Sequence, residues 1–281
     1  MPDAAQTYSE TVQTARNYYN SGDADNFYSI VWGGEDIHIG LYNSGDDSIR
    51  EASRRTVTHL AEIPEALDSE TAVLDMGSGY GGAARYLASK YGARVTALNL
   101  SERENARARE LNAQRGLDGL IEVIDGSFEE IPAEDCAFDL VWSQDAILHS
   151  GDRERVVREV ARVLRPGGNF VFTDPMQSDD CPDGVLQPIL DRIHLETLGS
   201  PGFYHRAAAS AGLTGTGFKE MTDQLVNHYS RVLAETERRE ADLDGLVSNE
   251  YIENMKRGLR HWIEGGQKGH LTWGVFHFRL N

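Results

Sequence analysis

The sequence predicts an α/β fold: a mostly parallel sheet covered by helices and closed by antiparallel strands, with an N-terminal helical cap and an insertion after the fifth strand. From residue 72, short apolar segments alternate with helical stretches, which is the order of a parallel sheet. A glycine-rich turn, DMGSGYGG, follows the first apolar segment and opens a helix. Near the C-terminus, LTWGVFHFRL supplies a closing strand.

The elements follow in order along the chain. Residues 8–30 and 46–63 have helical patterns, and the paired glycines of WGGEDIHIGLY (32–42) predict a shaped loop between them. The five core strands are AVLDMG, RVTALNL, IEVIDG, FDLVWSQ and NFVFTDP. Helices near 81–91, 101–115 and 152–164 alternate with these strands, and RPGG (165–168) is a turn.

After the fifth strand, residues 176–210 are predicted to form the insertion, which contains a helix. GFKEMTDQL and LTWGVFHFRL then form antiparallel strands around one long helix near 228–263. We therefore expect two parts, a cap and substrate or cofactor lid at 1–65 and a core at 66–281.

The charge balance restricts the classes of partner. The chain has 45 acidic residues against 27 Lys and Arg, a formal net charge of −18, which repels nucleic-acid phosphates and anionic membranes. The prediction is a small-molecule substrate, with neither nucleic acid nor membrane as partner, and a monomer or a homodimer. The acidic excess fits either an ordinary solvated surface or adaptation to a salty cytoplasm, as in a halophile, and both interpretations stay open.

Cysteine usage and the N-terminus indicate a cytoplasmic protein. Cys136 and Cys181 lie far apart without metal-ligand spacing, so neither a disulfide framework nor a metal site is expected. The segment MPDAAQTYSETVQ lacks the basic start and apolar stretch of an export signal.

The glycine-rich loop favours a cationic ligand over a dinucleotide. Gly77 and Gly79 permit a tight turn in which a ligand touches the backbone at a helix N-terminus, and Ser78 lies between them. Asp75 precedes the loop, where a carboxylate would repel a pyrophosphate but attract a cation. The second strand ends in Asn99, whose amide can bond both hydroxyls of a ribose.

With LDMGSGYGG as its first motif, the chain resembles the class I S-adenosylmethionine-dependent methyltransferases over residues 55–175. The resemblance implies a Rossmann-like sheet and S-adenosylmethionine as cofactor, with S-adenosylhomocysteine as product and no metal. The family normally has an acid where this chain has Asn99. The cofactor-binding residues expected on this basis are Asp75, Gly77, Ser78, Gly79, Asn99, Leu100, Gly126, Ser127, Phe128 and Gln144.

The catalytic candidates lie just after the fourth strand, in WSQDAILH at 142–149, at the sheet edge where ligands bind in such folds. If this stretch is helical, Asp145 and His149 lie at i and i+4 on one face, and the carboxylate can orient the imidazole or help to bind an ammonium. An amine accepts a methyl group only through a free lone pair, so we expect His149 to act as base, with Tyr19 as a partner.

Aromatic rings and an arginine are expected around the acceptor. Aromatic faces stabilise a methylated ammonium, and the available rings are Tyr18, Tyr19, Tyr28, Trp32, Tyr204 and Tyr229. A substrate carboxylate requires a cation, and the sequence leaves open Arg50, Arg54, Arg55, Arg206 and Arg231. The substrate-binding residues predicted are Tyr28, Trp32, His38, Tyr204, Arg206 and Tyr229.

Outside the common core, a narrower resemblance covers nearly the whole chain from about Asn26. WGGEDIHIGLY, WSQDAILHS, TDPM and NMKRGLRHWIEGGQKGHLTWG are similar to segments of the sarcosine/dimethylglycine N-methyltransferases. This resemblance implies N-methylation of sarcosine or dimethylglycine and betaine biosynthesis, the formation of an osmoprotectant. The DAILH segment also resembles the phosphoethanolamine methyltransferases, in which an aspartate, a histidine and an N-terminal tyrosine serve the amine.

Two alternatives remain. The first is a methyltransferase for another small amine, such as phosphoethanolamine or glycine, although a phosphorylated acceptor calls for more basic residues than this chain offers. The second is a catalytically inactive regulatory protein that binds S-adenosylmethionine.

Overall fold

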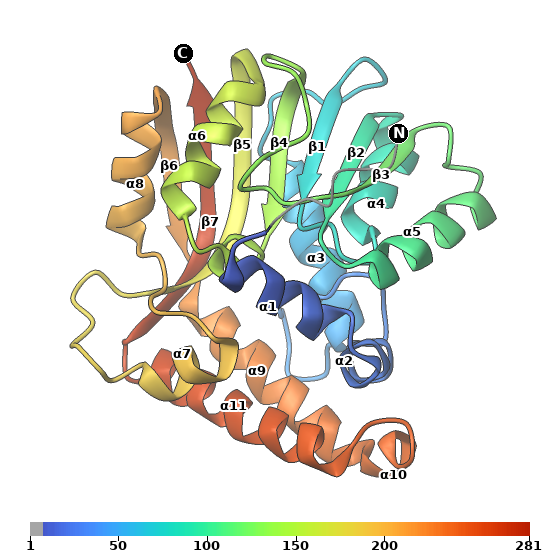
Figure 1. Cartoon of the computed structure of the whole chain (residues 1–281), viewed down its shortest axis with the longest axis vertical. Helices are drawn as coiled ribbons and strands as arrows, with labels where there is room; N and C mark the ends of the chain where they lie inside the picture. The colour runs from blue at the N-terminus through green and yellow to red at the C-terminus, as the bar shows by residue number, and fades with distance from the viewer. Residues whose placement is uncertain (1–7) are drawn as a thin grey trace.

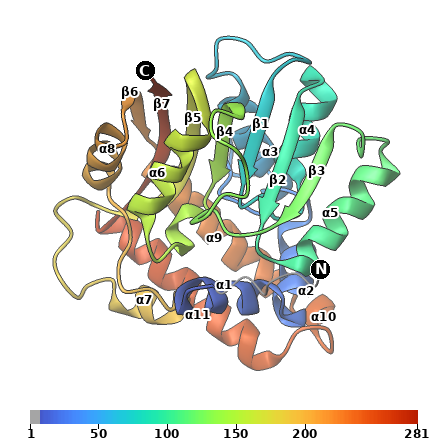
Figure 2. The ribbon, with the colours of Figure 1, turned by 45° about the horizontal axis from the view of Figure 1, so that its top comes forward.

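A computed structural model describes residues 8–281 as one mixed sheet flanked by helices, which confirms the predicted α/β class (Figures 1 and 2). The first seven residues, which include the start of the predicted cap and of the segment assessed as an export signal, lie outside the described part. Within residues 8–281, no helix is long and apolar enough to cross a membrane.

The sheet has seven strands in the order β3-β2-β1-β4-β5-β7-β6. Strands β1 to β5 run parallel, while β7 is antiparallel to both β5 and β6, as the sequence predicted for the closing strands. The bounds are β1 (Ala72–Met76), β2 (Arg94–Asn99), β3 (Ile121–Asp125), β4 (Phe138–Gln144), β5 (Leu164–Gln177), β6 (Leu213–Glu220) and β7 (Leu271–Leu280).

The helices form three groups along the chain. The N-terminal group is α1 (Glu10–Tyr19), α2 (Gly22–Phe27), the π-helical turn η1 (Tyr28–Trp32) and α3 (Ile49–Ala61). The core contains α4 (Gly82–Tyr91), α5 (Glu102–Gln114), the short 3₁₀ turn η2 (Ile147–His149) and α6 (Arg153–Val163). The C-terminal group is α7 (Gln187–Ile193), α8 (Pro201–Ser210), α9 (Thr222–Arg238), α10 (Glu240–Leu243) and α11 (Asn249–Gln267).

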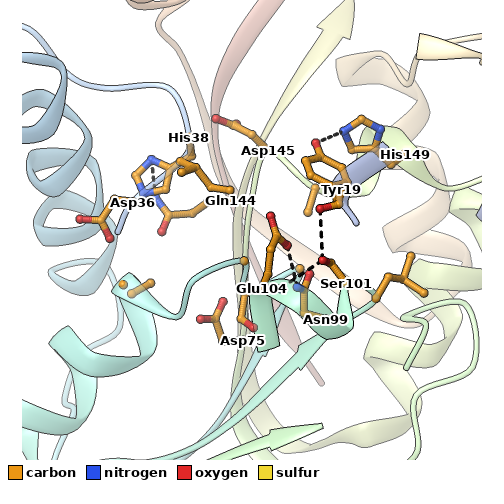
Figure 3. Close-up of a pocket in the computed structure, with 18 of the residues that line it drawn as sticks. Tyr19, Asp36, His38, Asp75, Asn99, Ser101, Glu104, Gln144, Asp145 and His149 are labelled. Carbon is orange, nitrogen blue, oxygen red and sulfur yellow. Dashed lines mark hydrogen bonds between the residues drawn. The ribbon is translucent and has the colours of Figure 1, made fainter. Parts of the chain in front are cut away.

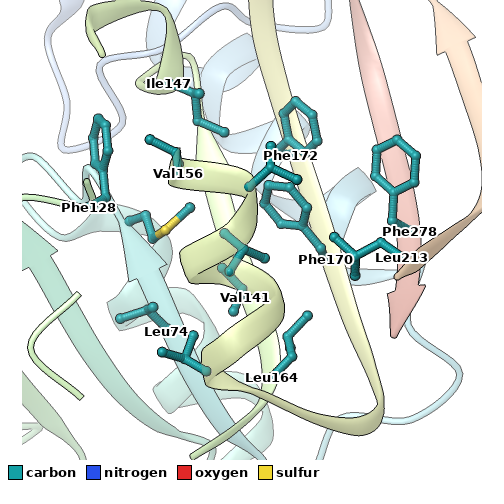
Figure 4. Close-up of a cluster of buried hydrophobic side chains, with 14 of the residues drawn as sticks. Leu74, Phe128, Val141, Ile147, Val156, Leu164, Phe170, Phe172, Leu213 and Phe278 are labelled. Carbon is teal, nitrogen blue, oxygen red and sulfur yellow. The ribbon is translucent and has the colours of Figure 1, made fainter. Parts of the chain in front are cut away.

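One face of the sheet is covered by α6 and α8. Helix α6 carries Val156, Val157, Val160 and Val163 on a single stripe, and all four are buried against the strands (Figure 4). Across β5 and β7, Phe172 lies opposite Phe276, with ring centroids 4.8 Å apart. Helices α3 and α4 cover the other face, so both sides of the parallel strands are apolar.

Four local expectations were wrong, the first of them the turn at residues 165–168, which lies within β5. The long helix near 228–263 is two packed helices, α9 and α11, because Gly245 at φ +73° and the N-cap Ser248 separate them. The predicted strand over residues 217–225 ends at Glu220, and Thr222 begins α9. The insertion contains two helices, α7 and α8, where the pattern indicated one.

The N-terminal and C-terminal helices meet at one end of the sheet. Figure 1 shows α1, α7, α9 and α11 together beyond the carboxyl ends of the parallel strands. Helix α11 packs on both α7 and α9, and α1 contacts η2, which follows β4. Segments distant in sequence therefore enclose the sheet edge at which α/β folds bind their ligands.

Replacing Phe172 with Ala is expected to lower the free energy of unfolding by about 3–5 kcal/mol, because the ring is fully buried in the β5–β7 aromatic stack. Urea denaturation followed by circular dichroism measures the change. Leu246→Ala is the control, since Leu246 is 54% exposed and should change stability by less than about 0.5 kcal/mol. Equal effects of the two substitutions would contradict this placement of the core.

Candidate active site

The glycine-rich loop joins β1 to α4 in a backbone conformation that requires glycine. Gly77, Gly79 and Gly81 have φ values of +70°, +52° and +76°. A Cβ on Gly77 would lie 2.3 Å from the Cβ of Ala146, so the loop packs directly against the segment that follows β4. The loop and the predicted catalytic stretch therefore form one continuous wall.

A first cavity opens on this wall and contains most of the predicted cofactor residues (Figure 3). Those that line it are Asp75, Gly77, Ser78, Gly79, Asn99, Leu100, Phe128 and Gln144. Gly126 and Ser127 were predicted as well, but neither is among the lining residues. The Ser127 hydroxyl instead accepts a bond from the backbone of Glu129, at 3.1 Å, within its own turn.

The first cavity carries buried acceptors without protein partners. Oδ2 of Asp75 and Oδ1 of Asp36 are both buried and make no hydrogen bond, although the other oxygen of Asp36 lies 2.9 Å from Nη2 of Arg54. Burial, with a contribution from the neighbouring Asp36, raises the pKa of Asp75 to about 7. A cation in this cavity would find an unpartnered oxygen on each of the two side chains and would stabilise the ionised form of Asp75.

Glu104, which was not among the residues predicted from the sequence, lines the same cavity beside Asn99 (Figure 3). Nδ2 of Asn99 donates to Oε2 of Glu104 at 2.8 Å, and burial raises the pKa of Glu104 to about 7. The position of Glu104 follows from helix capping, because the hydroxyl of Ser101 accepts from the Glu104 backbone at 3.2 Å. The available signal was the S-x-x-E pattern that begins directly after Asn99-Leu100.

Asp145 lies where the first cavity meets a second one, but the predicted helical pairing with His149 was wrong. Asp145 has φ +53°, outside the helical region, and only residues Ile147–His149 form a turn. Its carboxylate accepts from the backbone of Ile39 and from Nε1 of Trp273, each at 2.7 Å. Asp145 thus ties the loop of residues 32–42 to strand β7.

His149 is paired with Tyr19 instead. The Tyr19 hydroxyl lies 2.9 Å from Nε2 of His149 (Figure 3). Both side chains line both cavities. Burial, and then the positive charges of Arg153 and Arg192, lower the pKa of His149 to about 4. Burial also raises the pKa of Tyr19 well above its usual value. Near neutral pH this is a neutral imidazole next to a protonated phenol, a pair able to pass a proton.

The second cavity is rich in aromatic side chains. Its rings are Tyr18, Tyr19, Tyr28, Trp32, Tyr229 and Trp262, drawn from α1, η1, α9 and α11. Tyr28 and Trp32 come from the two ends of the π-helical turn, with ring centroids 5.0 Å apart. Trp262 is an addition to the predicted set. These rings, which no single segment supplies, make a site suited to a methylated ammonium.

Two predicted substrate residues lie elsewhere. Tyr204 is fully buried under β5, where its hydroxyl donates to Asp174 at 2.6 Å. Arg206 is exposed on α8 and lines neither cavity. The other predicted members, Tyr28, Trp32, His38 and Tyr229, do line the second cavity. The arginine that lines this cavity is Arg192 on α7, which was not among the arginines predicted from the sequence.

The residues described by the structure contain no group of three or more His, Cys, Asp or Glu side chains placed to hold a metal ion.

Known proteins resemble this chain over nearly its whole length. A family model described as a methyltransferase domain matches residues 74–172. The chain is 61% identical to a sarcosine/dimethylglycine N-methyltransferase of Halorhodospira halochloris, across 96% of this chain and 97% of that protein. It is 52% identical to the enzyme of that description from Aphanothece halophytica, across 94% and 95%.

A solved structure agrees with these relatives. The fold matches the crystal structure of a Galdieria sulphuraria protein described as a sarcosine dimethylglycine methyltransferase, with a TM-score of 0.89 and 48% identity. The match covers 93% of this chain and 98% of that one.

Affinity for S-adenosylmethionine is expected to rise between pH 6 and pH 8, because Asp75 and Glu104, each with a pKa of about 7, accept hydrogen bonds from a ligand's ammonium and hydroxyl groups best when they are ionised. The gain is about tenfold for each carboxylate whose ionised form is required. Glu104→Gln keeps an acceptor for Asn99 but removes the titrating carboxyl. Its affinity for S-adenosylmethionine, measured by calorimetry, should therefore rise less between pH 6 and pH 8.

The cofactor's own amino group titrates equally with both proteins, so comparison of the two pH profiles isolates Glu104. Glu110→Gln, an exposed change on the same helix, is the control and should reproduce the unmodified profile. Identical profiles for Glu104→Gln and the unmodified protein would remove Glu104 from the cofactor site.

Proposed function

This chain belongs to the sarcosine/dimethylglycine N-methyltransferase family, S-adenosylmethionine-dependent enzymes of class I, and we propose that it methylates sarcosine to dimethylglycine and dimethylglycine to glycine betaine. The observation that carries the proposal is the junction of two cavities at the Tyr19–His149 pair. One cavity is acidic and the other aromatic, which suits a sulfonium cofactor on one side and a methylated amine on the other.

The first cavity fits the cofactor. Gly77 and Gly79 let a ligand approach the backbone, Asn99 and Glu104 offer polar groups for ribose hydroxyls, and Phe128 supplies an apolar wall for a base. The unpartnered oxygens of Asp75 and Asp36 are acceptors for an ammonium group. When bound, S-adenosylmethionine supplies an electrophilic methyl group on a sulfonium sulfur.

The Tyr19–His149 pair provides a route for the proton that the amine must lose. An ammonium has no lone pair, so its proton must leave before the nitrogen can attack a methyl carbon. Tyr19 can accept that proton while donating its own to Nε2 of His149, which the lowered pKa keeps neutral. Burial also assists, because it lowers the pKa of an ammonium in the cavity.

The second cavity favours acceptors that already carry methyl groups. Faces of Tyr28, Trp32 and Tyr229 attract a cation without a strong hydrogen bond, and they suit N-methyl groups better than three N–H donors. The carboxylate of Asp145, at the boundary of the two cavities, adds negative charge near the amine. This environment favours sarcosine and dimethylglycine over glycine.

The purified protein, supplied with S-adenosylmethionine, is expected to form betaine from sarcosine and from dimethylglycine, with little product from glycine or phosphoethanolamine. Mass spectrometry of S-adenosylhomocysteine and of each methylated product measures this. Bound cofactor with no S-adenosylhomocysteine from any amine would indicate an inactive binding protein and would refute the proposal.

His149→Ala is expected to reduce kcat by about 10²–10⁴-fold, because it removes the final proton acceptor. Tyr19→Phe should reduce kcat as well, while cofactor affinity stays close to that of the unmodified protein in both variants. Steady-state kinetics with dimethylglycine and calorimetry with S-adenosylmethionine measure the two effects. His205→Ala on α8, which lines neither cavity, is the matched control. Unchanged kcat in His149→Ala would exclude the proton route.

A further inference from the structure

The second cavity contains buried nitrogen atoms that have no hydrogen-bond partner. These atoms are Nε1 of Trp32, Nε2 of His38 and Nε2 of His228, and their residues are 6%, 8% and 0% exposed. Leaving a buried N–H donor unpaired costs about 1–3 kcal/mol, so such donors at a cavity wall are suited to a ligand that carries acceptors. They contrast with the first cavity, where the unpartnered atoms named above are acidic acceptors.

The structure fixes the proton of His228 on Nε2. Its Nδ1 lies 3.1 Å from the backbone nitrogen of Gly40, which can only donate, and 3.0 Å from the hydroxyl of Tyr42. Nδ1 is therefore the acceptor, and burial lowers the pKa of His228 to about 3, which keeps the ring neutral. A neutral ring that accepts at Nδ1 must carry its hydrogen on Nε2, the atom without a partner.

Trp32 provides a second donor beside the first. Its indole nitrogen can only donate, and its ring centroid lies 5.4 Å from that of His228. His38 is different, because Nδ1 contacts both the Ile39 carbonyl and Gln144, which leaves its tautomer open. The defined donors are therefore the N–H groups of Trp32 and His228.

Arg192 adds a positive charge to the same cavity. Its side chain crosses α11 at Gly258, where a Cβ would lie 2.4 Å from Nε, so glycine leaves room for the guanidinium. Nη2 lies 2.5 Å from Sδ of Met255, a neutral and weak acceptor. No carboxylate of the described residues forms an ion pair with Arg192, although this chain has 45 acidic residues.

A ligand's carboxylate that becomes buried requires hydrogen-bond donors and a positive charge. Trp32 and His228 supply two neutral donors, and Arg192 supplies a guanidinium that no carboxylate among residues 8–281 neutralises. We propose that Trp32, His228 and Arg192 form the site for the acceptor's carboxylate, which makes the enzyme selective for N-methylated amino acids over neutral amines. This inference rests on the proposed function, because it assigns the part of the acceptor that the Tyr19–His149 pair does not contact. It replaces Arg206, the arginine that the sequence suggested.

The test compares dimethylglycine with N,N-dimethylglycinamide, which has the same amine but no carboxylate. The substitutions are Trp32→Phe, His228→Asn and Arg192→Met. Each removes one donor or the charge, and the amide oxygen introduced by His228→Asn still offers an acceptor to the Gly40 backbone. The measured quantity is the ratio of kcat/KM for the acid to kcat/KM for the amide. Each substitution is expected to reduce this ratio by about 10–100-fold, as for hydrogen bonds to a charged group.

Two further variants distinguish recognition from structural damage. Arg192→Lys restores the charge and should recover part of the ratio, whereas Arg260→Met, on the exposed side of α11, should leave it unchanged. Calorimetry with S-adenosylmethionine identifies any variant that has failed to fold. Because His228 is fully buried, the His228 variant has the greatest chance of failing to fold. In that case the Trp32 and Arg192 variants alone test whether this site binds the acceptor's carboxylate.

The two proposals fail in different ways. If the unmodified protein forms betaine and the ratio is the same in Trp32→Phe and Arg192→Met, the carboxylate site is overturned and the proposed function stands. If the unmodified protein methylates neither compound, the proposed function fails, and the carboxylate site fails with it. A lower ratio in these variants, with recovery in Arg192→Lys, supports the inference.

Discussion

The carboxylate of Asp145 holds together the parts from which the two cavities are built. It accepts hydrogen bonds from the backbone of Ile39 in the N-terminal loop and from Trp273 on β7, while its own backbone takes a left-handed conformation at the end of β4. The packing of Gly77 on Ala146 adds the cofactor loop to this junction. Without the carboxylate, two buried donors would lose their partner, and loop, sheet and C-terminal strand would lose their common point of attachment.

The two cavities share a wall but differ in the kind of polar group that has no hydrogen-bond partner in the described part of the protein. On the sheet side, Asp36 and Asp75 present oxygens without donors; on the helix side, Trp32 and His228 present donors without acceptors. The shared residues Tyr19 and His149 satisfy each other. In the proposed function, this arrangement places the cationic cofactor next to the zwitterionic acceptor, and the reacting atoms meet at the boundary between the two cavities.

The sequence predicted those features that depend on local patterns. Apolar runs gave the parallel strands, the glycines gave the loop, and Asp145, His149 and Tyr19 were expected near one another. Features that depend on tertiary packing were not predictable. Arg192 lies in an insertion without a motif, and only its position opposite Gly258 on α11 brings it to the cavity. The i, i+4 pairing of Asp145 and His149 failed because tertiary bonds to Ile39 and Trp273 determine the local backbone.

The charge of Arg192 has a consequence beyond holding a ligand. Burial is the main cause of the low pKa of His149, and the positive charges of Arg153 and then Arg192 lower it further, so the side chain proposed to bind the acceptor's carboxylate also weakens the base. An acceptor whose carboxylate binds Arg192 offsets this effect and raises the pKa of His149. His149 is therefore a stronger base when such an acceptor is bound than when the bound amine has no negative charge. Discrimination between acceptors then appears in the rate of the proton transfer as well as in affinity.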